Sequence, residues 1–217
     1  MKRIAIIVTI AAMLLSGCGV MKQDNSVSQE EQGKVTTMDP LLLQDVKQTV
    51  KLDEKTSIVN DIENYDVTVT KFYLSDKIEE DIDEWQDTAF EAQDGLEKTA
   101  ISSDGQLPEG YRVIYVEMTV TNNFDDSLNY GDGSFQIYKS VDGELQKAVE
   151  EIGYDSQATS GKSMNIAKIK KGESKQFRMG YIIDSDTADE ELYLELTNIS
   201  SDDASDFIVL PMEKQGE

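Results

Sequence analysis

The chain has 217 residues, of which 43 are acidic and 20 are basic, so its formal net charge at pH 7 is −23. A field of this sign repels nucleic acid, and we do not expect nucleic acid as a binding partner. The sequence contains no histidine, which excludes Ser-His-Asp and Cys-His catalytic machinery and zinc sites built on imidazole.

The first 17 residues have the layout of a secretory signal. Lys2 and Arg3 form a positively charged start, and an apolar run over residues 4 to 15 follows them. A run of this length matches the central region of a signal peptide and is too short to span a bilayer, which needs about 20 apolar residues. We therefore expect residues 1–17 to be removed from the mature protein.

The run ends in a short motif that contains the only cysteine of the chain. The motif consists of Leu15, Ser16, Gly17 and Cys18, and it resembles the lipobox of bacterial lipoproteins. The resemblance implies that the signal peptidase recognises the first three residues and that Cys18, joined to a diacylglycerol carrying fatty acids such as palmitate, becomes the new N-terminus. The protein is then expected on the extracytoplasmic side of the cell membrane.

Residues 18–44 are predicted to be the lipidated cysteine and a flexible tether. Residues 19 to 37 are polar, have no hydrophobic period and contain almost no large apolar side chain. We expect residues 19–44 to be dispensable for folding, and a single domain to occupy residues 45–217.

The first clear strand pattern lies between residues 65 and 74. Alternate residues from 65 to 69 are apolar, which is the period of a strand with one buried face. The pattern then changes phase, so that Phe72 and Leu74 form the next apolar pair. A shift by one residue within a strand predicts a β-bulge near Lys71.

Residues 77–100 form an acidic insert with a different period. Their apolar residues recur at intervals near 3.6, with Ser75 or Asp76 as a suitable N-cap. We expect one short amphipathic helix over residues 77–88, followed by an acidic loop. Trp85 lies on the apolar stripe, and packing onto the domain is favoured over a role as an exposed binding aromatic.

From Tyr111 onward the hydrophobic period is two. In the strongest run, Val116 and every second residue around it are apolar, and we expect this face to point into the core. About seven to nine short strands separated by turn residues predict an all-β fold, an antiparallel β-sandwich. The later predicted strands are residues 135–138, 145–149, 177–183, 192–196 and 207–210.

These strands carry a family resemblance. Residues 110–123 contain a glycine followed by an aromatic residue, then alternating apolar residues, then Thr-Asn-Asn. This order resembles a strand of the immunoglobulin-like domains that occur in Gram-positive lipoproteins of unknown function. That domain type is similar to the fold of a mycobacterial immunoprotective extracellular antigen. Residues 170–174 resemble a later turn of this domain type, and residues 192–196 resemble a strand that follows that turn. The resemblance covers about residues 60–210 and implies an immunoglobulin-like sandwich without catalytic residues; the acidic insert departs from it.

Acidic loops are the remaining candidates for a metal site. One cluster begins with an Asp-x-Asp pattern that suits Ca²⁺, but it lacks the central glycine and the final glutamate spacing of an EF-hand. Solvated loop acids are the favoured interpretation, and we expect no cofactor beyond the diacylglycerol anchor. The first cluster comprises Asp184, Asp186, Asp189 and Glu191, and a second comprises Asp202, Asp203 and Asp206.

Taken together, the sequence favours a non-enzymatic interaction module at the cell surface. Its expected partners are the membrane, through the lipid anchor, and another cell-surface protein or a wall component. Two alternatives remain open at this point. One is a Ca²⁺-stabilised structural or sensory module. The other is a small hydrolase that uses a pair of carboxylates.

Overall fold

The computed structural model describes residues 40–60, 64–130, 135–149, 151–157, 167–197 and 203–213. The strands are β1 Gln48–Thr49, β2 Thr56–Val59, β3 Asn64–Ser75, β4 Tyr111–Asn122, β5 Leu128–Tyr130, β6 Ile137–Val141, β7 Glu144–Lys147, β8 Tyr154–Asp155, β9 Ala167–Ile169, β10 Ser174–Asp184, β11 Leu192–Glu195 and β12 Ile208–Pro211. The helices are α1 Asp87–Glu91 and α2 Ser185–Ala188, with single 3-10 turns at Leu43–Asp45, Ile82–Glu84, Lys98–Ala100 and Ala204–Asp206.

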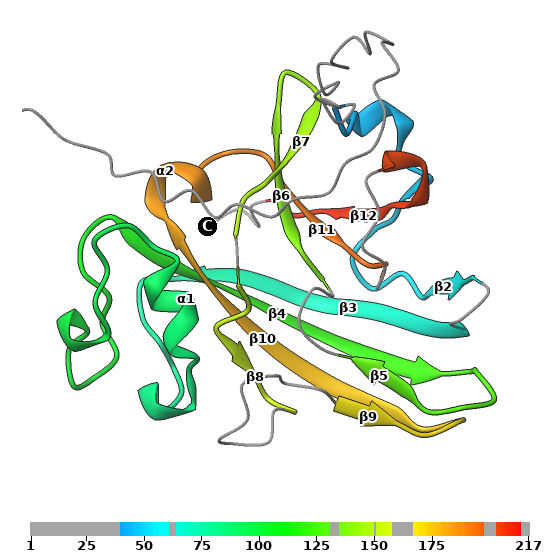
Figure 1. The fold of residues 1–217 in the computed structure, drawn as a ribbon, viewed down its shortest axis with the longest axis horizontal. Coiled ribbons are helices and arrows are strands. Elements are labelled where there is room, and N and C mark those ends of the chain that lie inside the picture. Colours follow the sequence, from blue (N-terminus) through cyan, green and yellow to red (C-terminus); the bar gives the residue numbers. More distant parts are fainter. Residues whose placement is uncertain are drawn as a thin grey trace, which may run out of the picture. The chain divides into compact units, whose positions relative to one another are not determined.

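The described strands form two five-stranded sheets. Figure 1 shows the two sheets packed against each other. The first sheet has the order β2-β3-β4-β10-β8 and the second β1-β12-β11-β6-β7. In their order across the first sheet, β3, β4, β10 and β8 take the places of strands A, B, E and D of an immunoglobulin domain, and in the second sheet β12, β11 and β6 take those of G, F and C. The prediction of an immunoglobulin-like β-sandwich is therefore confirmed.

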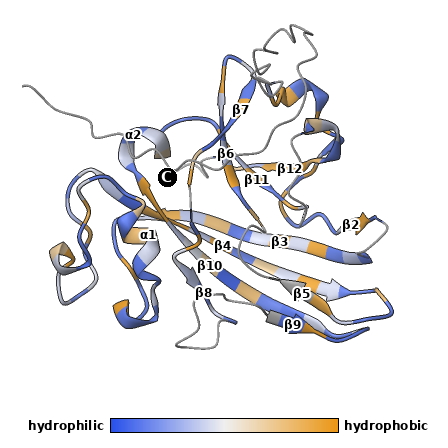
Figure 2. Cartoon of the chain, viewed as in Figure 1, coloured by the Kyte–Doolittle hydropathy of each residue, from blue (hydrophilic) through white to orange (hydrophobic). Residues whose placement is uncertain are grey.

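The first sheet is built on three long strands. β4 pairs antiparallel with β3 on one side and with β10 on the other. The register of β3 shifts between Val69 and Lys71, which confirms the predicted β-bulge. Figure 2 shows apolar and polar positions alternating along these strands. The alternation places every second residue of β4 from Ile114 to Val120 in the main core between the sheets, as the period of two predicted.

The outer face of the first sheet is also partly buried, because the acidic insert covers it. Trp85, Phe90 and Leu96 of the insert pack with Val113 and Tyr115 of β4 in a second apolar cluster. The packing role predicted for Trp85 is confirmed. This cluster explains why consecutive residues of β4 are buried, although a strand with one solvated face would alternate between buried and exposed residues.

The predicted helix over residues 77–88 is wrong. The segment instead contains a 3-10 turn at Ile82–Glu84 and the five-residue helix α1, Asp87–Glu91. Neither is long enough to be stable by itself, since isolated helices shorter than about 12 residues are marginal in water. Contacts with the first sheet hold the insert in place. Its apolar residues are therefore buried against the sheet, although they do not lie on one face of a regular helix.

The start of the domain also differs from the prediction, which placed it at residue 45. The compact unit extends from Met38, and Leu41 and Leu43 pack against Tyr193 and Phe207 on the outer face of the second sheet. The amide of Leu145 also donates a hydrogen bond of 2.7 Å to the carbonyl of Leu41. Part of the expected tether therefore belongs to the fold, because the half-buried side chains of Leu41 and Leu43 pack on the second sheet.

Deletion of this segment is expected to weaken the domain. A chain that begins at residue 46 loses the two half-buried leucines, and we expect it to be less stable than a chain beginning at Met38 by about 2 kcal/mol. Urea unfolding of the two truncated chains measures the difference. Equal midpoints would show that Leu41 and Leu43 contribute nothing to stability and that the boundary at residue 45 was adequate.

Candidate binding site

The predicted lipidation motif, which consists of Leu15, Ser16, Gly17 and Cys18, lies outside the described residues. No helix in the described part of the chain is long and apolar enough to cross a membrane. The anchor therefore continues to rest on the sequence motif.

The described structure does not bring Asp184, Asp186, Asp189 and Glu191 together as a group that could hold a metal ion. The Asp184 carboxylate caps α2 by accepting a hydrogen bond of 2.8 Å from the amide of Thr187. Burial is the largest single effect and opposes the charged form, but hydrogen bonds from Thr187 and from the backbone of Asp184, with the charge of Lys139, together lower the pKa of Asp184 below its ordinary value. Glu191 accepts a hydrogen bond from the Tyr193 hydroxyl, while Asp186 and Asp189 lie within and just after the short helix.

No group of three acidic, histidine or cysteine side chains within the described ranges could hold a metal ion. In the second acidic cluster, Asp203 caps the 3-10 turn Ala204–Asp206 through the amide of Ser205, and Asp202 lies outside the described residues. The positions of Asp184 and Asp203 have a local reason, because short polar side chains cap the N-terminal ends of helical turns well.

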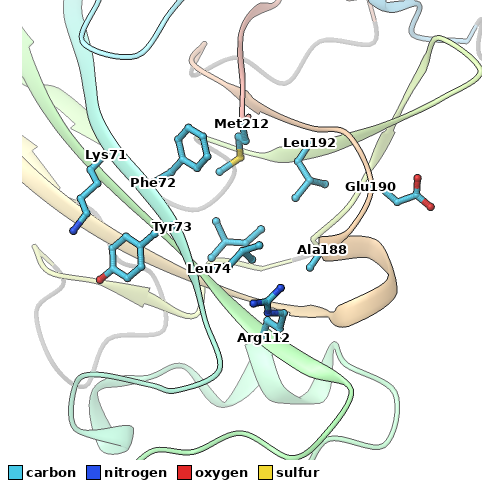
Figure 3. A pocket seen from close by; sticks show the side chains of 10 residues that line it. Lys71, Phe72, Tyr73, Leu74, Arg112, Ala188, Glu190, Leu192 and Met212 are labelled. Atoms are coloured by element: carbon cyan, nitrogen blue, oxygen red, sulfur yellow. The ribbon is translucent and has the colours of Figure 1, made fainter. Parts of the chain in front are cut away.

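A cavity of about 350 Å³ opens between the two sheets, where β3 passes the end of the second sheet. Figure 3 shows Phe72 and Leu74 of β3 turning toward Leu192 of β11 and Met212, the first residue after β12. We call this cavity the inter-sheet slot. Its volume lies in the range of small-ligand pockets in proteins, which are mostly apolar with few polar groups.

The slot owes its existence to the bulge. The phase change at Val69–Lys71 turns Phe72 and Leu74 toward the second sheet and leaves Lys71 and Tyr73 on the other face (Figure 3). β1 pairs with β12 only at Ile208 and Val209, so it does not extend far enough to close the gap. Phe72 and Leu74 therefore remain half-buried beside the main core.

The sequence contained one sign of this site, the phase change itself. Phe72 and Leu74 were recognised as strand residues with a shifted pattern, but nothing in the local sequence shows that the opposite sheet ends early. Three further residues line the slot: Arg112 comes from β4, and Ala188 and Glu190 come from the end of α2 and the residues after it. Their convergence depends on the path of the chain and has no periodic signature.

A polar cluster beneath the insert joins it to the first sheet. The Arg178 guanidinium of β10 lies 4.4 Å from the centre of the Tyr115 ring, pairs with Glu79, and places Nη1 2.8 Å from a carboxylate oxygen of Glu80. Burial opposes the charge, but these acids raise the pKa of Arg178 above its ordinary value. Tyr115 also donates a hydrogen bond of 2.8 Å to Glu80. The cluster is a structural link, because one guanidinium of β10 pairs with two carboxylates of the insert.

Glu195 of β11 is a buried acid that makes stability depend on pH. Burial raises the pKa of Glu195 from 4.5 to about 7, although a hydrogen bond from Thr197 opposes the shift. The folded chain therefore holds this proton more tightly than the unfolded chain, so the contribution to stability is full below pH 4.5 and is lost as the pH rises through 7.

We expect Glu195→Gln to remove this dependence. Relative to the original chain, the variant should gain stability between pH 5 and pH 8, by up to about 3 kcal/mol. Urea unfolding at a series of pH values measures the difference between the two chains, and Glu190→Gln, at an exposed acid, is the control. If the difference in unfolding free energy between the two chains were the same at every pH, it would contradict the raised pKa of Glu195.

No protein-family model matches the chain, and a search of curated proteins gives no match. Among solved structures, the chain is similar to an uncharacterised β-sandwich protein from Clostridium difficile 630, with 13% identity, a TM-score of 0.40, and coverage of 77% of this chain and 95% of that one. It is also similar to the yjhA protein of Bacillus subtilis, with 14% identity, a TM-score of 0.42, and coverage of 74% and 98%. A conserved hypothetical protein from Bacillus anthracis has 16% identity, a TM-score of 0.34, and coverage of 66% and 87%.

Proposed function

We propose that this chain is a lipid-anchored protein on the extracytoplasmic side of a bacterial membrane, and that its β-sandwich is a non-catalytic binding module. The binding site in this proposal is the inter-sheet slot. The single observation that carries the proposal is a cavity of about 350 Å³, lined by apolar residues and by Lys71, Arg112 and Glu190, that stays open between sheets whose remaining inner faces are closely packed.

An open apolar cavity has a physical cost for the free protein. Phe72 and Leu74 are each only half-buried, next to a core whose residues are almost fully enclosed. Contact with water forfeits part of the roughly 25 cal/mol that each Å² of buried apolar surface contributes. A ligand that fills the slot recovers this free energy, which is why apolar openings of this kind mark binding sites.

The anchor is tested by replacing the lipidated residue. Cys18→Ala removes the only thiol of the chain, so we expect the variant to incorporate no labelled fatty acid and to leave the detergent phase in Triton X-114 partition. The original chain should carry the label and partition into detergent. Detergent partition that is the same for both chains would refute the anchor.

The slot is tested by site-specific photo-crosslinking on intact cells. A photoreactive amino acid at position 74 should give discrete crosslinked species. The control places the same group at Val59 of β2, a hydrophobic residue on the same sheet that is 60% exposed. Labelling of the same species at both positions would show that the slot is not the binding site.

A further inference from the structure

The slot lies beside a stretch of sheet edge that no described strand occupies. β4 pairs with β3 along its length, but β2 pairs with β3 only over residues 64–67. Within the described ranges, the side of residues 71–75 opposite β4 therefore has no partner strand. Backbone N–H and C=O groups at such an edge are available to another strand.

The bulge and Lys71 restrict how this edge can be used. Bulges and edge lysines discourage indiscriminate pairing between sheets, because they twist the edge and add charge. The flat part of the edge is then short, from Phe72 to Ser75, and it borders the slot through Phe72 and Leu74. An incoming strand that pairs here can direct alternate side chains into the slot, since side chains alternate between the faces of a strand.

The charges around the slot favour a positive partner. Arg112 lies 3.1 Å from Asp76, and Lys71 lies 4.0 Å from Glu117, so both cations near the slot are close to a carboxylate. In the described part of the chain, the Glu190 side chain on the facing wall has no ion pair. The chain as a whole carries a formal charge of −23, and a field of this size attracts cations over long range.

We propose that the slot binds an extended segment of a basic partner protein by strand addition to β3. In this arrangement the segment pairs with residues 71–75, inserts an apolar side chain between Phe72 and Leu192, and places a lysine or arginine near Glu190. Main-chain hydrogen bonds then supply affinity and the slot supplies specificity, as in other complexes formed by strand addition. The inference rests on the proposed function and names the chemistry of its partner.

A second copy of this chain is a poorer occupant. Two molecules of charge −23 repel each other, and the repulsion is strongest at low salt, where long-range fields are least screened. A basic segment experiences the same field as an attraction. Its association should therefore weaken as salt is added, and self-association of the chain should not.

The experiment uses the soluble full domain, from Met38 onward, and a synthetic octapeptide in which lysine alternates with leucine, with both ends blocked. Calorimetric titration should show binding that Leu74→Gln weakens at least about tenfold and that Val59→Gln leaves unchanged. Glu190→Gln should weaken binding and reduce its salt dependence, whereas Glu91→Gln, at an exposed acid on the insert, should do neither.

Two altered peptides separate strand addition from simple attraction between charges. One replaces each lysine by glutamate, and it should not bind. The other carries N-methyl groups on alternate amides, which blocks one edge of the peptide backbone, and it should bind at least about tenfold more weakly. Hydrogen exchange should show protection of the amides of residues 71–75 with the original peptide only.

The proposal is overturned if the octapeptide does not bind, if Leu74→Gln and Val59→Gln have equal effects, or if the N-methylated peptide binds as well as the original. If the octapeptide fails to bind but a photoreactive group at position 74 still gives discrete crosslinked species on intact cells, the slot remains the binding site. In that case only the extended basic partner would be wrong. Failure of both experiments would refute the binding module itself.

Discussion

Val116→Asp is expected to unfold the domain. Val116 has no exposed surface and lies at the centre of β4, between Phe72 of β3 and Met179 of β10. The described residues of the main core offer a carboxylate there no cation, and the buried hydroxyls of Tyr65 and Tyr181 already donate to backbone carbonyls. The new carboxylate therefore either remains charged at high cost or takes up a proton. We expect a loss of at least about 4 kcal/mol, against a typical domain stability of about 5–15 kcal/mol.

Thr119→Asp is the matched control for this variant. It introduces the same side chain into the same strand, but Thr119 faces the outer side of the first sheet, is half-buried, and pairs with Thr68 and Gln176 rather than with core residues. We expect a loss of no more than about 1 kcal/mol. Chemical denaturation of both variants decides the matter, and similar losses at the two positions would show that the register of β4 is wrong.

Gly180→Ala is expected to displace the only tryptophan of the chain. A Cβ atom at Gly180 of β10 would lie 2.5 Å from Cη2 of Trp85 and 3.3 Å from Cε1 of Tyr115. Alanine ordinarily suits a strand interior better than glycine by about 0.5–1 kcal/mol. We nevertheless expect the variant to lose about 1–3 kcal/mol, because the rigid indole must move out of a close-packed site.

Trp85 provides both the measurement and the control. Because it is the only tryptophan and is 3% exposed, its emission reports directly on the site, and Gly180→Ala should shift that emission to longer wavelength. In a Trp85→Leu background the added methyl group has room, so there Gly180→Ala should be neutral or stabilising. A loss of stability of the same size in both backgrounds would mean that the indole contact is not the cause.

Much of the candidate site could not be predicted from the sequence. The bulge near Lys71 was predicted, because a change of phase is a local signal. The slot that the bulge opens was not, since its far wall depends on where β11 and β12 end. The acids from Asp184 to Glu191 were considered as ligands because of their spacing, yet Asp184 and Glu191 bond to neighbouring Thr187 and Tyr193. Spacing alone does not distinguish a helix cap from a metal ligand.

The sequence by itself determined the long strands, their inward faces and the sandwich class. Alternation of apolar residues along β4 is a property of neighbouring residues, and the strand period converts it directly into a buried face. Only the tertiary structure decided how the outer faces are covered. The helical turns of the insert are too short to be stable by themselves, and Leu41 and Leu43 lie in a segment without hydrophobic period. Both segments therefore take the conformation that packs their apolar side chains on a sheet formed by distant residues.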